Sequence, residues 1–108
     1  MAFDTGLHTR VAEALAGHPI AEKRMFGGVG FLLGGHLACG ILKDDLIVRV
    51  GADRYAAALA RDHVRVFDIT GKVMKGWVMV APEGVSEDRD LAHWVQAGVA
   101  FARTLPPK

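Results

Sequence analysis

Three apolar runs rich in Val, Ile, Leu and Phe dominate residues 24–50. The pair Gly34-Gly35 separates the first run from the second, and Lys43-Asp44-Asp45 separates the second from the third. Gly-Gly suits a two-residue hairpin turn, in which both central residues take a positive φ. The pattern therefore predicts a three-stranded antiparallel meander.

The two turns also predict the register. A turn at Gly34-Gly35 places Leu32 opposite Leu37 and Phe31 opposite Ala38, and a turn at Asp44-Asp45 places Ile41 opposite Val48. One face is then expected to carry Leu32, Leu37, Cys39, Ile41, Leu46, Val48 and Val50, and the other Val29, Phe31, Leu33, Ala38, Ile47 and Arg49. A three-residue loop at Gly34 would exchange the faces, because a slip of one residue turns every side chain over.

Helical spacing of apolar residues predicts a first helix over residues 4–17, capped by Asp4 or Thr5. A short alanine-rich helix is predicted over 54–63, with Asp53 as its cap. The last helix follows a cap at Ser86, and Gly98 near its centre should let its backbone approach the sheet closely.

Strands are predicted at residues 64–67 and 76–80, separated by a turn at 70–72. Residues 21–25 are expected to be extended, which leaves open one extra strand before Phe26. The element order is thus α-β-β-β-α-β-β-α. Hairpin connections favour an α+β fold with a mostly antiparallel five-stranded sheet and flanking helices. The length of 108 residues fits one domain, 1–108.

Composition is that of an ordinary globular protein, with 51% hydrophobic and 23% charged residues. A net charge of +1 is low for a nucleic-acid-binding domain. The lone Cys39 cannot form an internal disulfide, which fits a reducing cytoplasm. No signal peptide and no membrane-spanning run is apparent, so we expect a cytoplasmic protein without membrane contact.

Candidate chemistry is sparse. The five histidines show no metal-ligand spacing, and the carboxylates fall at helix caps and turns. Gly27, Gly28 and Gly30 lead into a strand rather than a helix, which favours a bulge over a phosphate loop. We expect Cys39 to be a small buried hydrophobe. No catalytic residue, metal ligand or cofactor is predicted.

Two surfaces are predicted instead. The cations Arg24, Arg49, Lys72 and Lys75, with Trp77, could form a small anion or nucleic-acid patch, although solvated surface side chains are the simpler interpretation. The first and last helices should cover the face that bears Leu32, Ile41 and Val48. The second face would then be left exposed, with Val29, Phe31, Leu33 and Ile47 on its surface. We expect a homodimer to form through this face or its adjacent edge.

Residues 24–31 (RMFGGVGF) and 46–50 (LIVRV), with 70–78 (TGKVMKGWV) and 100–106 (AFARTLP), resemble the N-terminal domain of the TfoX/Sxy family. The resemblance implies a regulator of natural competence that acts on transcription together with a partner regulator. It also implies a fold like that of small secretion chaperones, and it supplies no established catalytic residues.

Three functions are therefore expected, and they are given in order of decreasing support from the sequence. The first is a non-enzymatic interaction or regulatory domain that acts through protein contacts. The second is a nucleic-acid-binding module using Arg24, Arg49, Lys72 and Lys75, whose phosphate contacts would make binding strongly salt-dependent. The third is a small-molecule enzyme.

Overall fold

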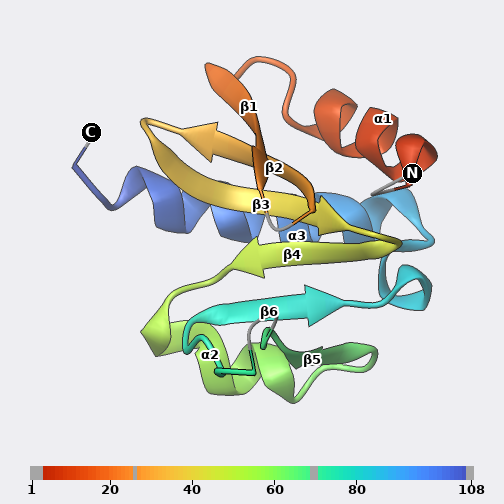
Figure 1. The fold of residues 1–108 in the computed structure, drawn as a ribbon, viewed down its shortest axis with the longest axis vertical. Helices are drawn as coiled ribbons and strands as arrows, with labels where there is room; N and C mark the ends of the chain where they lie inside the picture. Colours follow the sequence, from red (N-terminus) through yellow and green to blue (C-terminus); the bar gives the residue numbers. More distant parts are fainter. Residues whose placement is uncertain (1–3, 26, 69–70, 107–108) are drawn as a thin grey trace.

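The computed structural model describes residues 4–25, 27–68 and 71–106, and the description below refers to these residues. They form an α+β fold in which helices pack on an antiparallel sheet (Figure 1). The elements are α1 (Thr5–Ala14), β1 (Ile20–Met25), β2 (Gly28–Leu33), β3 (His36–Leu42), β4 (Asp45–Arg49), α2 (Ala52–Leu59), β5 (Val64–Val66), β6 (Trp77–Val80), the 3-10 helix η1 (Pro82–Val85) and α3 (Asp88–Arg103). Within the described ranges, none of the helices has the length and apolar character that crossing a bilayer requires.

The sheet has six strands in the order β1-β2-β3-β4-β6-β5, and all neighbours are antiparallel. The expected count of five is corrected by β1, which pairs with β2 from Ile20 opposite Leu33 to Met25 opposite Gly28. The extended segment before Phe26 is thus an edge strand. Phe26 itself and the expected turn residue Thr70 lie outside the described residues.

The register differs from the expected one at two places. Leu32 lies opposite Leu37 as predicted, but a bulge between Phe31 and Leu32 places Phe31 opposite Cys39 rather than Ala38. The second turn falls at Lys43-Asp44, where Lys43 adopts a φ of 55°, rather than at Asp44-Asp45. Ile41 therefore lies opposite Leu46, and Val48 lies opposite Cys39.

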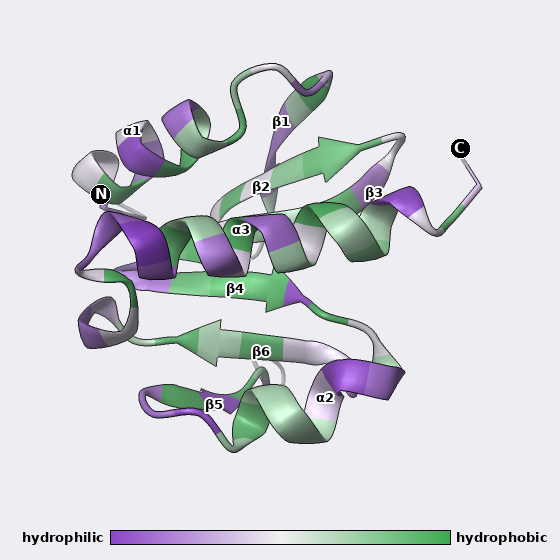
Figure 2. Cartoon of the chain, turned by 180° about the vertical axis from the view of Figure 1, so that it is seen from behind, coloured by the Kyte–Doolittle hydropathy of each residue, from purple (hydrophilic) through white to green (hydrophobic). Residues whose placement is uncertain are grey.

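The bulge brings all three alternate residues of β2, Val29, Phe31 and Leu33, onto the face that α1 and α3 cover. Figure 2 shows both helices on the same side of the sheet. The main core on this face also contains Cys39, Ile41, Leu46, Val48 and Val50, as expected. The opposite face gathers a second, smaller cluster made of Leu37, Ile47, Phe67 and Met79.

No helix covers this opposite face among the described residues; instead, the segment between β5 and β6 folds over it. The amide of Met74 donates to the carbonyl of Phe67 over 3.0 Å, and Phe67 is fully buried. Met74 and Trp77 pack against the small cluster from the same segment. In Figure 1, α3 lies behind the sheet, so this face is the one toward the viewer.

Helix ends follow the predictions in part. The Asp4 carboxylate caps α1 by accepting from the amides of Gly6 and Leu7. Helix α2 begins at Ala52 after Gly51, which leaves Asp53 in the first turn rather than at the cap. Helix α3 is preceded by Glu87 rather than Ser86, because the Ser86 hydroxyl donates back to the carbonyl of Glu83 in η1.

Candidate functional site

The structure brings Arg49 and Trp77 of the expected cationic patch together. The two residues lie opposite each other on β4 and β6. The guanidinium carbon of Arg49 lies 5.4 Å from the centre of the Trp77 ring and 5.2 Å from that of Phe101. Trp77 in turn stacks on Phe67, with 5.7 Å between ring centres. Arg49 is thus held between two aromatic rings, an arrangement that stabilises a cation.

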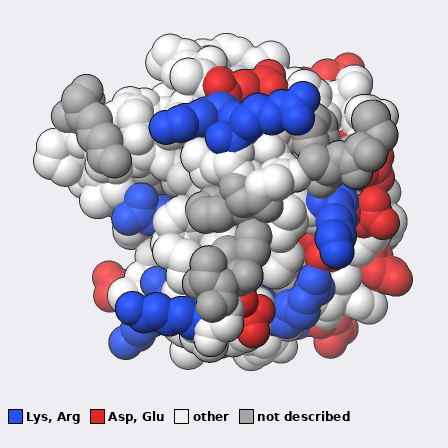
Figure 3. Space-filling model, viewed as in Figure 1, with Lys and Arg blue, Asp and Glu red and all other residues white. Residues whose placement is uncertain are grey.

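Arg24 does not belong to this cluster. It lies on the edge strand β1, with β2 and β3 between it and β4, so about 14 Å of sheet separates the two strands. Lys72 and Lys75 are exposed on the segment that leads into Trp77. Figure 3 shows Lys and Arg atoms in separate groups on this face, with Asp and Glu atoms beside them. The expected cations therefore do not form one continuous basic stripe.

The expected self-association face is not a surface. Val29, Phe31 and Leu33 are 6%, 1% and 9% exposed and lie beneath the protein's own helices. Ile47 is buried on the opposite face, in the small cluster with Phe67. The bulge between β2 and β3, in which Ala38 of β3 is the extra residue, causes this rearrangement. Homodimerisation stays a prediction, and the adjacent edge that was named with this face is strand β1.

Cys39 is fully buried in the main core, as predicted. Burial raises the pKa of its thiol to about 12, because a thiolate would lose its hydration there. The thiol is consequently neutral at physiological pH, which makes it a poor nucleophile. Among the residues that the structure describes, no three His, Cys, Asp or Glu side chains converge in a way that could hold a metal ion.

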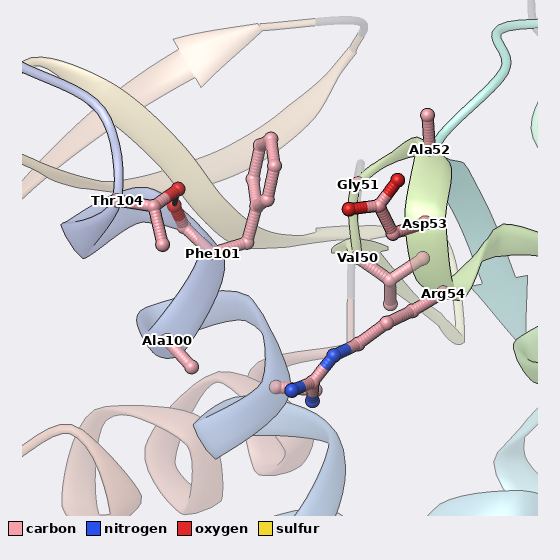
Figure 4. Close-up of a pocket in the computed structure, with 9 residues that line it drawn as sticks. Val50, Gly51, Ala52, Asp53, Arg54, Ala100, Phe101 and Thr104 are labelled. Atoms are coloured by element: carbon pink, nitrogen blue, oxygen red, sulfur yellow. Dashed lines mark hydrogen bonds between the residues drawn. The ribbon is translucent and has the colours of Figure 1, made fainter.

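A concave surface lies between α2 and α3, and we call it the α2–α3 groove. Helix α2 packs on β5 and β6, whereas α3 packs on β3 and β4, so the two helices cover different strands. One part of the groove, about 570 Å³, is lined by Val50, Asp53, Arg54 and Phe101, among others. Figure 4 shows the Arg54 side chain extending from α2 toward α3.

A second hollow of about 230 Å³ shares Val50, Arg54 and Ala97 with the first and continues toward Arg61 and Trp94. The guanidinium carbon of Arg61 lies 5.1 Å from the centre of the Trp94 ring. Its Nη1 donates to Nε2 of His93 over 2.7 Å. Arg54 and Arg61 thus stand at the two ends of one wall of the groove.

The arginines around the groove differ in their partners from three other arginines of the protein. Three arginines elsewhere form ion pairs with acidic side chains: Arg10 with Asp88, Arg65 with Asp45 and Arg89 with Glu87. Within the described part of the chain, no ion pair joins Arg49, Arg54 or Arg61 to a carboxylate. Aromatic rings hold Arg49 and Arg61 instead.

Arg49 is a residue that the sequence patterns single out, but Arg54 and Arg61 are not. The available signal was weak: two arginines seven residues apart flank the alanine-rich run of residues 56–58. Such spacing puts them on one side of a helix of 3.6 residues per turn. It becomes informative only when α3 supplies Trp94 and Phe101 across the groove.

Comparison with known proteins gives one clear result. A family model described as the TfoX N-terminal domain matches residues 11–102. Comparisons with curated proteins and with solved structures found no match. The likeness to small secretion chaperones therefore stays a prediction. The match includes every strand of the sheet and nearly all of α3. The chain belongs to the TfoX N-terminal domain family.

Proposed function

We propose that this chain is a non-enzymatic regulatory domain that acts through protein contacts in the cytoplasm. Membership of the TfoX N-terminal domain family suggests a competence-related regulatory role. We further propose that the protein performs this role by contacting a partner regulator. A domain of this kind needs a surface with charged and apolar side chains that are available to contact a partner.

The α2–α3 groove is the observation that supports this mode best. Its arginines Arg54 and Arg61 are exposed and have no carboxylate partner among the described residues, while Val50 and Ala97 make its lining apolar. Interfaces commonly combine an apolar centre with arginine and aromatic side chains. The groove supplies these together on one side of the molecule.

Affinity capture from nuclease-treated lysate of the native cell tests the proposal. We expect the wild-type protein to retain a specific protein partner that the double variant Arg54→Glu/Arg61→Glu does not retain. Arg103→Glu, on the exposed end of α3, is the matched control. Capture that disappears on nuclease treatment would contradict a mode of action through protein contacts.

Nucleic-acid binding stays the alternative, since Arg49 beside Trp77 and Phe67 resembles the cation-and-aromatic pairs that contact single strands. Titration of duplex and single-stranded DNA at several salt concentrations separates the two functions. Phosphate contacts would give a steep salt dependence. We expect only weak binding, because the net charge is +1 and the cations are dispersed.

A further inference from the structure

We infer that the α2–α3 groove binds an acidic amphipathic helix of a partner protein, with carboxylates of that helix paired to Arg54 and Arg61. The inference rests on the proposed function and adds to it the chemical class of the partner. It is argued from how the arginines are held, how far apart they stand and what lies between them.

The arginines are oriented in a way that leaves N–H groups for an incoming carboxylate. The guanidinium of Arg61 lies over the Trp94 ring, and among the described residues one of its five N–H donors is bonded to His93. A contact with the aromatic ring does not consume N–H donors, and the remaining ones suit a carboxylate in a bidentate pair. A side chain held in this way also loses less rotamer entropy when it binds.

The spacing of the two arginines matches that of a helix laid along α2. Arg54 lies in the first turn of α2, and Arg61 lies two residues beyond its end. Seven residues at a helical rise of 1.5 Å correspond to about 10 Å. Acidic residues at positions i and i+7 of a partner helix are separated by the same distance. A helix parallel or antiparallel to α2 can thus place one carboxylate at each arginine.

The groove between the arginines suits apolar side chains of the partner. Ala57 and Ala97 are small residues on its two walls, and Val50 lies beneath them. The inner residues i+3 and i+4 of the bound helix would enter this space, as in other helix-in-groove complexes. The hollows of about 230 and 570 Å³ are large enough for leucine-sized side chains.

A protein partner fits these features better than a nucleic acid does. Duplex DNA carries a phosphate charge about every 1.7 Å along its axis, and its binding favours a row of cations. The groove has two separated arginines with apolar residues between them. This arrangement is complementary to an acidic amphipathic helix.

Fluorescence anisotropy with designed peptides tests the inference. The probe is a labelled, helix-stabilised peptide of about 18 residues with Glu at i and i+7 and Leu at i+3 and i+4. A second peptide carries Lys in place of Glu, and a third keeps its composition but places the two Glu residues on the opposite side of the helix. We expect the wild-type protein to bind the first peptide at least tenfold more tightly than the other two.

Charge exchange provides the decisive comparison. The affinity of Arg54→Glu/Arg61→Glu for the Glu peptide should be at least tenfold lower than that of the wild type, and its affinity for the Lys peptide should be higher. Arg103→Glu should bind both peptides as the wild type does. If the double variant fails to fold by circular dichroism, Arg54→Gln/Arg61→Gln should show the same loss without the gain. Equal binding of the three peptides, unchanged binding by the variants, or displacement of the Glu peptide by duplex DNA would overturn the inference. Protein capture that persists in the double variant would refute the groove yet leave the regulatory function standing.

Discussion

Gly98 of α3 lies directly against the carbonyl oxygen of Ala38 in β3. A Cβ built at position 98 would lie far inside van der Waals contact with that oxygen. The obstacle is backbone rather than a flexible side chain, so the helix or the strand would have to move. This is where the helix that supplies Trp94 and Phe101 to the α2–α3 groove is seated on the sheet.

The first prediction concerns that seat. Gly98→Ala should destabilise the protein by at least about 1–3 kcal/mol, and Gly98→Leu by more, because the added atoms overpack the interface. Chemical denaturation followed by circular dichroism measures the change. Gln96→Leu, at an exposed position of α3, is the control and should change stability little. A Gly98→Ala protein as stable as the wild type would contradict this close approach.

The second prediction concerns Cys39. A thiol reagent at pH 8 should label it only after denaturation, because the side chain is fully buried and its pKa is raised to about 12. The unfolded thiol has a pKa of about 9, so between pH 9 and 12 the unfolded chain loses a proton that the folded chain keeps. Stability contributed by this group is therefore complete below pH 9 and falls as the pH rises toward 12.

Comparison with Cys39→Ala isolates the contribution of that proton from every other effect of high pH on the protein. The wild-type free energy of unfolding should fall more steeply with pH above 9, by up to about 1.4 kcal/mol per pH unit. Parallel pH profiles of the two proteins, or rapid labelling of native Cys39, would contradict its burial.

The third prediction concerns the small cluster on the helix-free face. Phe67 is fully buried there and stacks on Trp77, so Phe67→Ala should cost about 3–5 kcal/mol. Val73, on the same segment, is 52% exposed, and Val73→Ala should change stability by less than about 0.5 kcal/mol. The denaturation midpoints of the two variants measure the difference in stability. Similar effects of the two substitutions would contradict the burial of Phe67 under this segment.

The fourth prediction separates two bonds of Arg10. Its Nη2 donates to the carbonyl of Val85 over 2.8 Å and pairs with Asp88 at 3.1 Å. The Asp88 side chain is 97% exposed, so Asp88→Asn should have almost no effect on stability. Arg10→Met keeps the apolar stem but leaves the Val85 carbonyl unpaired, at a cost of about 1 kcal/mol or more. Equal effects would mean that the ion pair dominates.

The fifth prediction is self-association. Because the residues first expected to mediate it are buried within one chain, the prediction now rests on the adjacent edge of the sheet, strand β1. Sedimentation at micromolar concentration measures the mass, and we expect a dimer to be lost on Arg24→Pro, since Arg24 lies between the residues of β1 that bond β2 and proline removes its outward-facing amide. A monomer in the wild-type protein would end this prediction.

Features that depend on neighbouring residues could be predicted from the sequence. The Asp4 cap, the turn at Gly34-Gly35 and the close approach at Gly98 each follow from the local chemistry of one or two residues. The faces of the sheet could not be predicted, because they depend on parity. One bulge, with Ala38 as the extra residue of β3, moves Val29, Phe31, Leu33 and Ala38 to the main core and Leu37 to the opposite face. The displaced turn, at the positive φ of Lys43, changes the partners of β3 and β4 but leaves their faces as expected.

The candidate site was predictable to a smaller extent. Arg49 and Trp77 are close because β4 and β6 pair, which the sequence pattern did not indicate. The α2–α3 groove depends on the distance between helices that pack on different strands. No periodicity in either helix encodes that distance, and it places Arg61 over Trp94, thirty-three positions later in the chain.

The strand order has a consequence for how the protein reaches its native state. Strands β1 to β4 are joined by tight hairpins, so their contacts are local and need little loop closure. Strand β5 precedes β6 in the chain but pairs only with it, at the far edge of the sheet. It therefore lacks a template until β6 has docked on β4. We expect substitutions in β2–β4 to slow folding and those in β5 mainly to accelerate unfolding, which stopped-flow kinetics would distinguish.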